Sequence, residues 1–437
     1  ADDLIMQSQG NGWFWGDHCY NVKSNYTSSA FRSYDVWYAN YKWIANVNYI
    51  IDAEPEMAGT EADVAYVAGQ AYAIRALCYL NLATWFSRAP YNSLTGASRW
   101  NEPCVPVYTT GTSIDTGGQP RESLRTVYGR IDQDIDRAIE LLEKARETTL
   151  AENNKSHINL YVALGIKSRA CLAEGDWDGA FKAAKRVIDE GGYAVGTKSD
   201  LTSGMNSLDK QNVMWGAGIQ VADQAGGYAG FFTHMDNKEG AYAKSAPKLI
   251  SKQLYNRISA TDIRRDWWDP SDKESPYVSK KFSFANVASF LGDYIYMRVE
   301  EMYFTAAEAA LRLDDLKSAR ELMNTVMAER DPGYSANNRS GTLLGATTTT
   351  WTGSFLENIL THRRIELWGE YGRLFDVRRL GQGIDRRTDD GFSEECISMM
   401  NRRNVNITKA DTYDWVLTIP KAELDANPNI NEEDQNP

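Results

Sequence analysis

Positive charge is scarce in this chain of 437 residues. Lys and Arg number 47 against 59 Asp and Glu, which gives a net charge of −12. No run of Lys or Arg with interleaved aromatics offsets this excess. A chain with this balance repels polyanions, so we expect no nucleic-acid partner.

Histidine and cysteine are also few. The four His residues are well separated, and the five Cys residues show neither a CxxC pair nor zinc-ligand spacing. We therefore expect no metal site and no cofactor, and we interpret the cysteines as structural. They are Cys19, Cys78, Cys104, Cys171 and Cys396.

No long apolar segment is free of charge. The least charged stretch, residues 65–87, is long enough to span a bilayer but carries Arg75 near its middle, at a cost of about 3 kcal/mol. We interpret it as a buried helix. The chain opens with ADDLIMQSQG and shows no apolar signal segment, which fits either a cytoplasmic protein or one whose leader has been removed.

Aromatic residues, in contrast, are abundant. The chain has 13 Trp and 24 Tyr, and many lie in polar, Gly-rich stretches where burial is hard to arrange. Exposed aromatics usually mark a surface that binds something. Long stretches without helical periodicity cover residues 91–120, 191–245, 261–296, 331–353 and 381–414. Loops of this length in a compact protein are usually functional or disordered.

Helical periodicity is found between these loops. It predicts helices over 31–51 and 121–146. Within residues 169–188 it predicts one helix that ends at Gly175 and a second helix that begins directly after it. A shift of 139 residues superposes the latter pair on 311–326, as in tetratricopeptide repeats separated by a long insertion. Short strands are predicted at 213–221 and 415–420.

The segment THRRIELWGEYGRLFDVRRLG, residues 361–381, is predicted to form one helix with a stripe of opposite charges at steps of three or four. Two carboxylates at i, i+4 could share a proton or hold a metal. The interleaved arginines, however, would keep both carboxylates ionised. We interpret the stripe as a structural ladder of ion pairs and predict no catalytic residue. Its members are Arg363, Glu366, Glu370, Arg373 and Asp376.

Four blocks in order resemble the SusD/RagB family of outer-membrane nutrient-binding lipoproteins. They are RALCYLNLATWFSRAPY (75–91), YMRVEEMYFTAAEAALRL (296–313), the charged segment 361–381 and the tail IPKAELDANPNINEEDQNP (419–437). Ser87 stands where the family has Gly, His362 stands where Glu is usual, and Glu432 to Asp434 interrupt the family's ending. The resemblance spans residue 2 to the end.

The resemblance and the helical pattern together imply a single domain over 1–437 with a mainly α fold. Tetratricopeptide-like helix hairpins would form a right-handed superhelical core, with long irregular loops and a few short strands. The core would occupy about 31–190 and 297–381, and the loop-rich ligand face about 191–296 and 331–353.

The resemblance also implies a function in nutrient uptake. Family members sit on the cell-surface side of the outer membrane, capture a nutrient that is typically a glycan, and deliver it to a SusC-like TonB-dependent transporter. They carry a signal peptide, a lipidated Cys and an initial helix before the segment that DDLIMQSQ resembles. By this resemblance the chain would be N-terminally shortened, and its lipid anchor would be absent from it.

No family motif fixes the ligand site, so its residues are predicted from composition. Sugars present flat C–H faces ringed by hydroxyls, and exposed aromatic plates beside hydrogen-bonding side chains bind them. Three aromatic loops fit: 10–18, 226–236 and 264–270. Their candidate residues are Trp13, Phe14, Trp15, Asp17, Tyr228, Phe231, Phe232, Trp267 and Trp268. The alternative for each loop is that its aromatics pin it to the helical core.

Other functions stay open at this point. The cargo could be a peptide or another non-glycan nutrient bound by the same lid mechanism. A helical-repeat scaffold that binds peptides in its groove would carry few loop aromatics, which the 13 Trp argue against. A glycan-degrading enzyme would need an acid and base pair of carboxylates in a cleft, and the best-spaced carboxylates are interleaved with Arg.

Overall fold

The chain forms two compact units, and each gathers segments from distant parts of the sequence. One, called the mixed unit below, comprises 1–19, 184–377 and 382–409; the other, the helical unit, comprises 20–183, 378–381 and 410–437. No single cut in the sequence separates them. The computed structural model describes residues 2–7, 14–19, 33–148, 150, 154–221, 230–402 and 416–437, without the side chains of residues 33 and 34.

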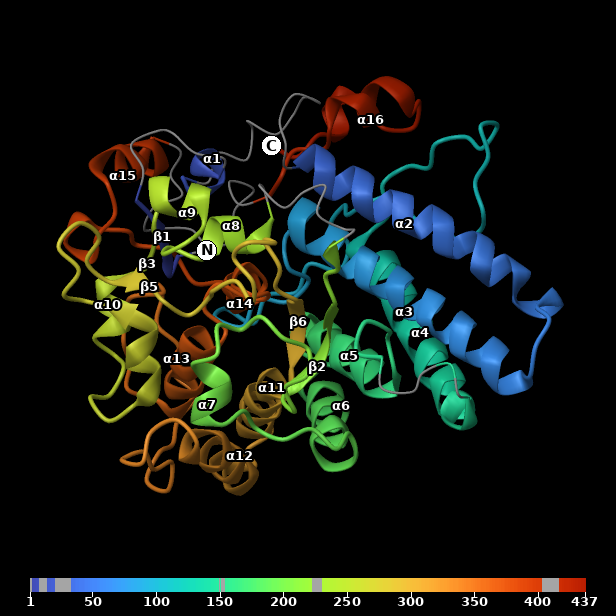
Figure 1. Cartoon of the computed structure of the whole chain (residues 1–437). Helices are drawn as coiled ribbons and strands as arrows, with labels where there is room; N and C mark the ends of the chain where they lie inside the picture. The colour runs from blue at the N-terminus through green and yellow to red at the C-terminus, as the bar shows by residue number, and fades with distance from the viewer. Residues whose placement is uncertain are drawn as a thin grey trace. The chain divides into compact units, whose positions relative to one another are not determined.

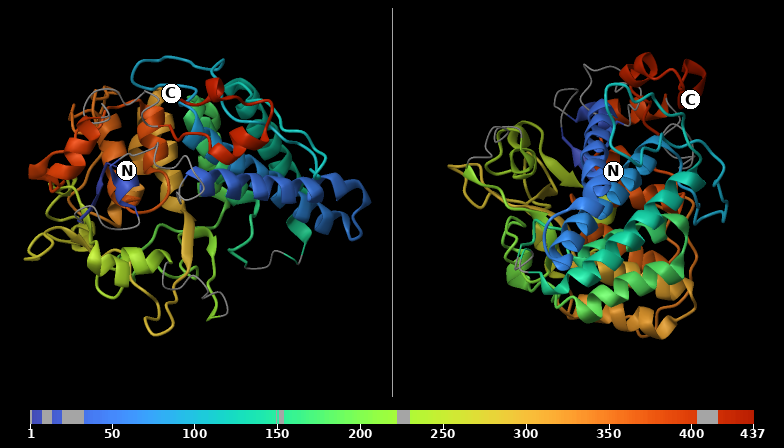
Figure 2. Two further views of the ribbon diagram at one scale, coloured as in Figure 1. Left: turned by 90° about the horizontal axis from the view of Figure 1, so that it is seen from above. Right: turned by 90° about the vertical axis from the view of Figure 1, so that its right-hand side faces the viewer.

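Long helices build the helical unit. Helix α3 packs against both α2 and α4, and α4 packs against α5, so the four helices lie side by side (Figure 2). Thr60 and Ser123 cap α3 and α4, each hydroxyl accepting a backbone N–H from the first turn. The bounds are α2 (Ser33–Ala53), α3 (Glu61–Phe86), α4 (Leu124–Lys144) and α5 (Leu160–Glu174), with 3-10 turns η2 (Glu54–Glu56) and η3 (Ala145–Glu147).

The stretch around Arg75 is a buried helix, as predicted. Arg75 is 2% exposed, and its guanidinium donates two hydrogen bonds of 2.7 Å to the Asp134 carboxylate and one of 2.7 Å to Asn48 Oδ1. A buried charge is tolerated where it is paired and hydrogen-bonded in this way. Within the described ranges, no helix is long and apolar enough to cross a membrane.

Both predicted helix pairs are present. Helix α5 ends at Gly175, which adopts φ +77°, and α6 (Trp177–Glu190) follows and leads from the helical into the mixed unit. In the mixed unit, α11 (Val299–Arg312) packs against α12 (Leu316–Ala328) across a turn in which Asp314 has φ +62°. The Asp315 side chain caps α12. The periodicity therefore identified both pairs correctly.

Two small antiparallel sheets lie in the mixed unit (Figure 1). The four-stranded sheet has the order β1-β3-β5-β4, and its first pairing sets Met6 opposite Lys248. The two-stranded sheet pairs β2 with β6. The strands are β1 (Leu4–Met6), β2 (Val213–Ala217), β3 (Lys248–Ile250), β4 (Trp268–Asp269), β5 (Val278–Ser279) and β6 (Tyr294–Arg298).

The short helices carry the remaining segments. In the mixed unit they are α1 (Trp15–His18), α7 (Lys198–Leu201), α8 (Phe231–Met235), α9 (Ala241–Ser245), α10 (Lys252–Tyr255), η5 (Ile263–Trp267), α13 (Phe355–Glu366), η6 (Thr388–Asp390) and α15 (Glu394–Asn401). Helix α14 (Arg373–Leu380) continues into the helical unit, which also holds α16 (Lys421–Ala426) and η8 (Glu432–Asp434).

Two predicted elements are wrong. Residues 361–381 form two helices, because α13 ends at Glu366 and the left-handed residues Gly369 (φ +75°) and Gly372 (φ +112°) turn the chain before α14. Over 416–420, the described part of the second predicted strand, no strand forms. Instead, the side chain of Gln435 accepts a hydrogen bond from the N–H of Ile419 and donates one to its carbonyl.

The predicted fold class is confirmed. Helices dominate the described residues, tetratricopeptide-like helix pairs recur, and a few short strands lie among long irregular loops.

Candidate ligand-binding site

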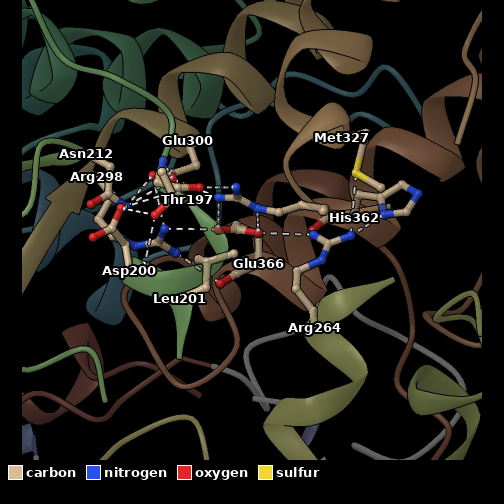
Figure 3. A network of polar contacts seen from close by, with 12 residues as sticks. Thr197, Asp200, Leu201, Asn212, Arg264, Arg298, Glu300, Met327, His362 and Glu366 are labelled. Atoms are coloured by element: carbon tan, nitrogen blue, oxygen red, sulfur yellow. Dashed lines mark hydrogen bonds and ion pairs between the residues drawn. The ribbon is translucent and has the colours of Figure 1, made fainter. Parts of the chain in front are cut away.

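The centre of the charge stripe, Glu366, is enclosed by cations. Arg264, Arg298 and Arg330 approach its carboxylate to 3.1, 3.0 and 2.9 Å, and all four side chains are fully buried. Arg264, Arg298 and Glu366 are labelled in Figure 3. Burial alone would raise the pKa of Glu366, but the arginines lower it well below its usual value. A carboxylate held ionised in this way cannot serve as a proton donor at neutral pH.

The rest of the stripe also pairs, mostly with residues outside it. Glu370 accepts hydrogen bonds from Arg298 Nε at 2.8 Å and from Lys281 Nζ at 2.6 Å. Arg373 pairs with Asp2 at 2.6 Å. Within the stripe, Arg363 Nε pairs with Asp376 Oδ2 at 2.8 Å. The contacts therefore join separate segments of the mixed unit instead of following one helix.

Four of the predicted aromatic ligand residues lie in the interior. Trp267 and Trp268 are 2% and 1% exposed, Phe232 is 1% exposed, and Trp15 is 7% exposed. Trp268 meets Trp368 edge to face at 5.7 Å, and Trp267 Nε1 donates to the Leu201 carbonyl at 2.8 Å. These four rings pack the core of the mixed unit, which corrects the expectation that they face solvent. Trp13 and Tyr228 lie outside the described residues.

The other three candidates meet at one pocket in the mixed unit. Phe14, Asp17 and Phe231 line a cavity of about 410 Å³, although they come from two loops predicted separately. Phe14 is 39% exposed, while Asp17 and Phe231 are half-buried. The remaining lining residues are Leu4, Met6, His18, His234, Met235 and Lys248.

Neighbouring elements fix the pocket walls. The carbonyl of Phe14 accepts the His18 N–H at 2.8 Å, which holds Phe14 at the start of α1. Its ring meets the His234 imidazole of α8 edge to face at 5.1 Å. The pairing of β1 with β3 then brings Met6 and Lys248 to the same wall. The cavity is therefore built largely before any ligand arrives.

Charge in the pocket is sparse and uneven. Burial lowers the pKa of Lys248 to about 8, and its Nζ donates to the Ala246 carbonyl at 2.5 Å. Burial, aided by Arg386, lowers the pKa of His18 to about 4, so this imidazole is neutral at pH 7. Among the described lining residues, Asp17 is the one carboxylate. The pocket thus offers an aromatic face, apolar walls and few hydrogen-bonding groups.

Two further cavities have none of the predicted candidate residues among the described residues of their walls. One, of about 790 Å³ in the mixed unit, has many charged side chains in its wall, which include Asp269, Asp272 and Lys280. The other, of about 260 Å³ in the helical unit, has Tyr41 and Tyr108 in its wall. No three His, Cys, Asp or Glu side chains converge as metal ligands in the described part of the chain.

Helix α2 also exposes aromatic rings that the sequence search did not single out. Tyr38, Trp43 and Tyr49 are 55%, 56% and 54% exposed. They lie away from the face of α2 on which Trp37 and Ile44 are buried. Helical spacing relative to that face was the signal that could have found them.

Comparison with known proteins gives the family. A model of the SusD family matches residues 237–437, and a model described as starch-binding associating with outer membrane matches residues 3–172. This chain belongs to the SusD family. No curated protein matches it in sequence.

Solved SusD-like structures share the fold. A SusD-like carbohydrate binding protein from Bacteroides vulgatus ATCC 8482 is 25% identical with a TM-score of 0.76, covering 99% of this chain and 90% of that chain. A SusD superfamily protein from Bacteroides thetaiotaomicron VPI-5482 is 21% identical with a TM-score of 0.80. The match covers 100% of this chain and 92% of that chain. Surface glycan-binding protein A from Bacteroides uniformis is 18% identical with a TM-score of 0.68. The match covers 100% of this chain and 91% of that chain.

The four SusD-like blocks hold the fold, and none of their residues is among the described residues that line the Phe14 pocket. Arg75 joins α3 to α4, and Glu366 joins several segments of the mixed unit. In the tail, the Asn436 amide donates to the carbonyls of Phe86 and Leu417 at 2.9 Å. These motifs explain why the SusD fold is recognisable in the sequence while the ligand site is not.

Proposed function

We propose that this SusD-family protein binds a glycan in the pocket lined by Phe14, Asp17 and Phe231. The observation that carries the proposal is the meeting of an exposed aromatic ring and a carboxylate at one largely preformed cavity. A sugar ring can lay its C–H face on Phe14 while its hydroxyls donate to Asp17. The carbohydrate-binding and glycan-binding relatives support a glycan over other cargo.

The proposal includes a cellular role. The protein would act at the cell-surface side of the outer membrane, attached by a lipid anchor, and pass its glycan to a SusC-like TonB-dependent transporter. The description of the matching family model supports the membrane association. Co-purification of a TonB-dependent barrel with the protein from its native membrane would test the partner.

We further propose that binding leaves the glycan intact. Glycosidases place two carboxyl groups about 5 to 9.5 Å apart across the bond they cleave. The described lining of the Phe14 pocket supplies only Asp17. Incubation with labelled oligosaccharides is expected to yield no shorter products, and the release of such products would contradict this part of the proposal.

Replacing Phe14 by Ala is expected to weaken glycan binding about tenfold or more. Truncating an aromatic anchor in a binding site typically costs at least 1 to 2 kcal/mol. Retardation in native gels cast with different polysaccharides measures the effect, beginning with the polysaccharide class that retards the unaltered protein. Asp17→Asn should weaken binding less, because the amide keeps an acceptor oxygen.

Trp43→Ala provides the matched control. Trp43 is a large ring, 56% exposed on α2 in the helical unit, and it does not line the Phe14 pocket. Its removal should leave retardation unchanged. Unchanged retardation of Phe14→Ala, or an equal loss in Trp43→Ala, would contradict the assignment of the pocket. No retardation by any polysaccharide would favour a peptide or other non-glycan cargo.

A further inference from the structure

Two of the five cysteines lie against each other in the mixed unit. Cys19 directly follows α1 and Cys396 lies on α15, and both are 0% exposed. Their side chains share a hydrogen bond. Cys396 Sγ also lies 3.9 Å from the carbonyl oxygen of His18, in the peptide that immediately precedes Cys19. The two thiols are thus neighbours despite their separation in sequence.

A buried cation makes the two sulfurs unequal. Arg386 is 2% exposed, and its Nη1 lies 3.6 Å from Cys396 Sγ. The hydrogen bond from Cys19, together with His18 and Arg386, lowers the pKa of Cys396 to about 4. The same hydrogen bond and burial raise the pKa of Cys19. Cys396 is therefore the more acidic of the two thiols. This favours Cys396 as the attacking group, because thiolates rather than thiols attack disulfides.

The other cysteines are placed differently. Cys104 Sγ lies 3.3 Å from the hydroxyl of Ser87, and burial raises its pKa to about 11. Burial likewise raises the pKa of Cys78 to about 12 and that of Cys171 further. These three behave as small apolar side chains in the helical unit.

We propose that Cys19 and Cys396 form a disulfide bond. The oxidant is a donor disulfide, either a small molecule such as oxidised glutathione or a thiol oxidoreductase met during folding. The Cys396 thiolate attacks one sulfur of the donor and releases the other as a thiolate. Cys19 then loses its proton and attacks Cys396 Sγ in the mixed disulfide, which releases the second donor thiolate. Two donor thiols are formed for each bond made.

The bond would hold one side of the Phe14 pocket. It would join the end of α1, which carries Asp17 and His18 of the pocket lining, to α15. Helix α15 lies in residues 382–409, the last segment of the sequence in the mixed unit. Closing so long a loop restricts the unfolded chain, so reduction should lower the thermal midpoint of unfolding. The inference rests on the cysteine geometry and does not depend on which ligand the pocket takes.

Counting thiols in the full chain tests the proposal. The protein is refolded with excess oxidised glutathione, freed of glutathione and denatured. It should then expose three reactive thiols, the five cysteines less the bonded two. Reduction should then expose all five. Peptide mapping without reductant should recover one linked pair, containing Cys19 and Cys396. Five reactive thiols after oxidation, or a link between other cysteines, would overturn it.

Two variants give matched readouts. Cys19→Ser should expose four thiols with or without oxidant, because Cys396 then has no neighbour to bond. Cys78→Ser should expose two after oxidation and keep the linked peptides. If Cys19→Ser fails to fold, the count on the unaltered chain still decides.

Discussion

Replacing Glu366 by Gln is expected to lower the free energy of unfolding by about 3 to 5 kcal/mol, the typical cost of removing one partner from a buried ion cluster. Arg264, Arg298 and Arg330 all lie within 3.1 Å of this carboxylate and are fully buried. Glutamine keeps the shape but removes the one carboxylate that all three guanidinium groups share, although Asp262, Glu300 and Glu370 still pair with them. Urea titration followed by circular dichroism measures the loss.

An exposed ion pair provides the comparison. Glu321 lies 3.9 Å from Lys317 on α12, and both side chains are well exposed to solvent. Glu321→Gln should change the free energy of unfolding by less than about 1 kcal/mol. If Glu366→Gln were no more destabilising than Glu321→Gln, the arginine cluster would not hold the mixed unit together.

Replacing Glu174 by Gln is expected to change the pH dependence of stability. Glu174 Oε1 is buried and has no hydrogen-bond partner among the described residues, and the side chain shares a hydrogen bond with Asp132. Burial, with Asp132 and Asp176 nearby, raises the pKa of Glu174 from 4.5 to about 9. Between about pH 4.5 and pH 9, Glu174 is therefore mostly protonated in the folded protein and mostly ionised in the unfolded chain.

The sign of the effect follows from that proton. The stability contributed by protonated Glu174 is complete below about pH 4.5 and is lost as the pH rises towards 9. Glutamine cannot titrate and can donate to Asp132 at every pH. The free energy of unfolding of Glu174→Gln relative to the unaltered protein should rise by about 1 to 3 kcal/mol between pH 5 and pH 8.

Urea titrations at the two pH values supply the measurement. Glu143→Gln is the control, because Glu143 is exposed on α4 in the same unit. Its stability should follow the pH curve of the unaltered protein. Parallel curves for Glu174→Gln and the unaltered protein would show that Glu174 is ionised in the folded state.

Periodicity was enough to predict the long helices, and local backbone geometry limited the rest. Helix α3 was predicted from a long, nearly uncharged stretch, and the α11–α12 pair was predicted from its superposition on residues 169–188. The charged segment 361–381 keeps helical spacing through Gly369 and Gly372, yet both glycines adopt positive φ and turn the chain. Spacing cannot distinguish a glycine that continues a helix from one that ends it.

The ligand site could be predicted only in part, because burial depends on tertiary contacts. Composition selected Phe14 and Trp267 on the same grounds, but Trp267 packs into the core while Phe14 stays at the pocket. The pocket itself forms where β1 pairs with β3, a contact between residues far apart in sequence. The neighbourhood of Cys19 and Cys396 has the same origin, and no cysteine spacing signals it.

Hydrogen-exchange mass spectrometry, with and without an oligosaccharide of the class that retards the protein, tests the proposed glycan site most directly. Binding should slow hydrogen exchange in α1 and α8, the segments that carry Asp17 and Phe231. Exchange in α2, which carries the exposed Trp43, should stay unchanged. Slowed exchange confined to α2, or to residues 269–284 beside the charged cavity, would contradict the assignment of the site.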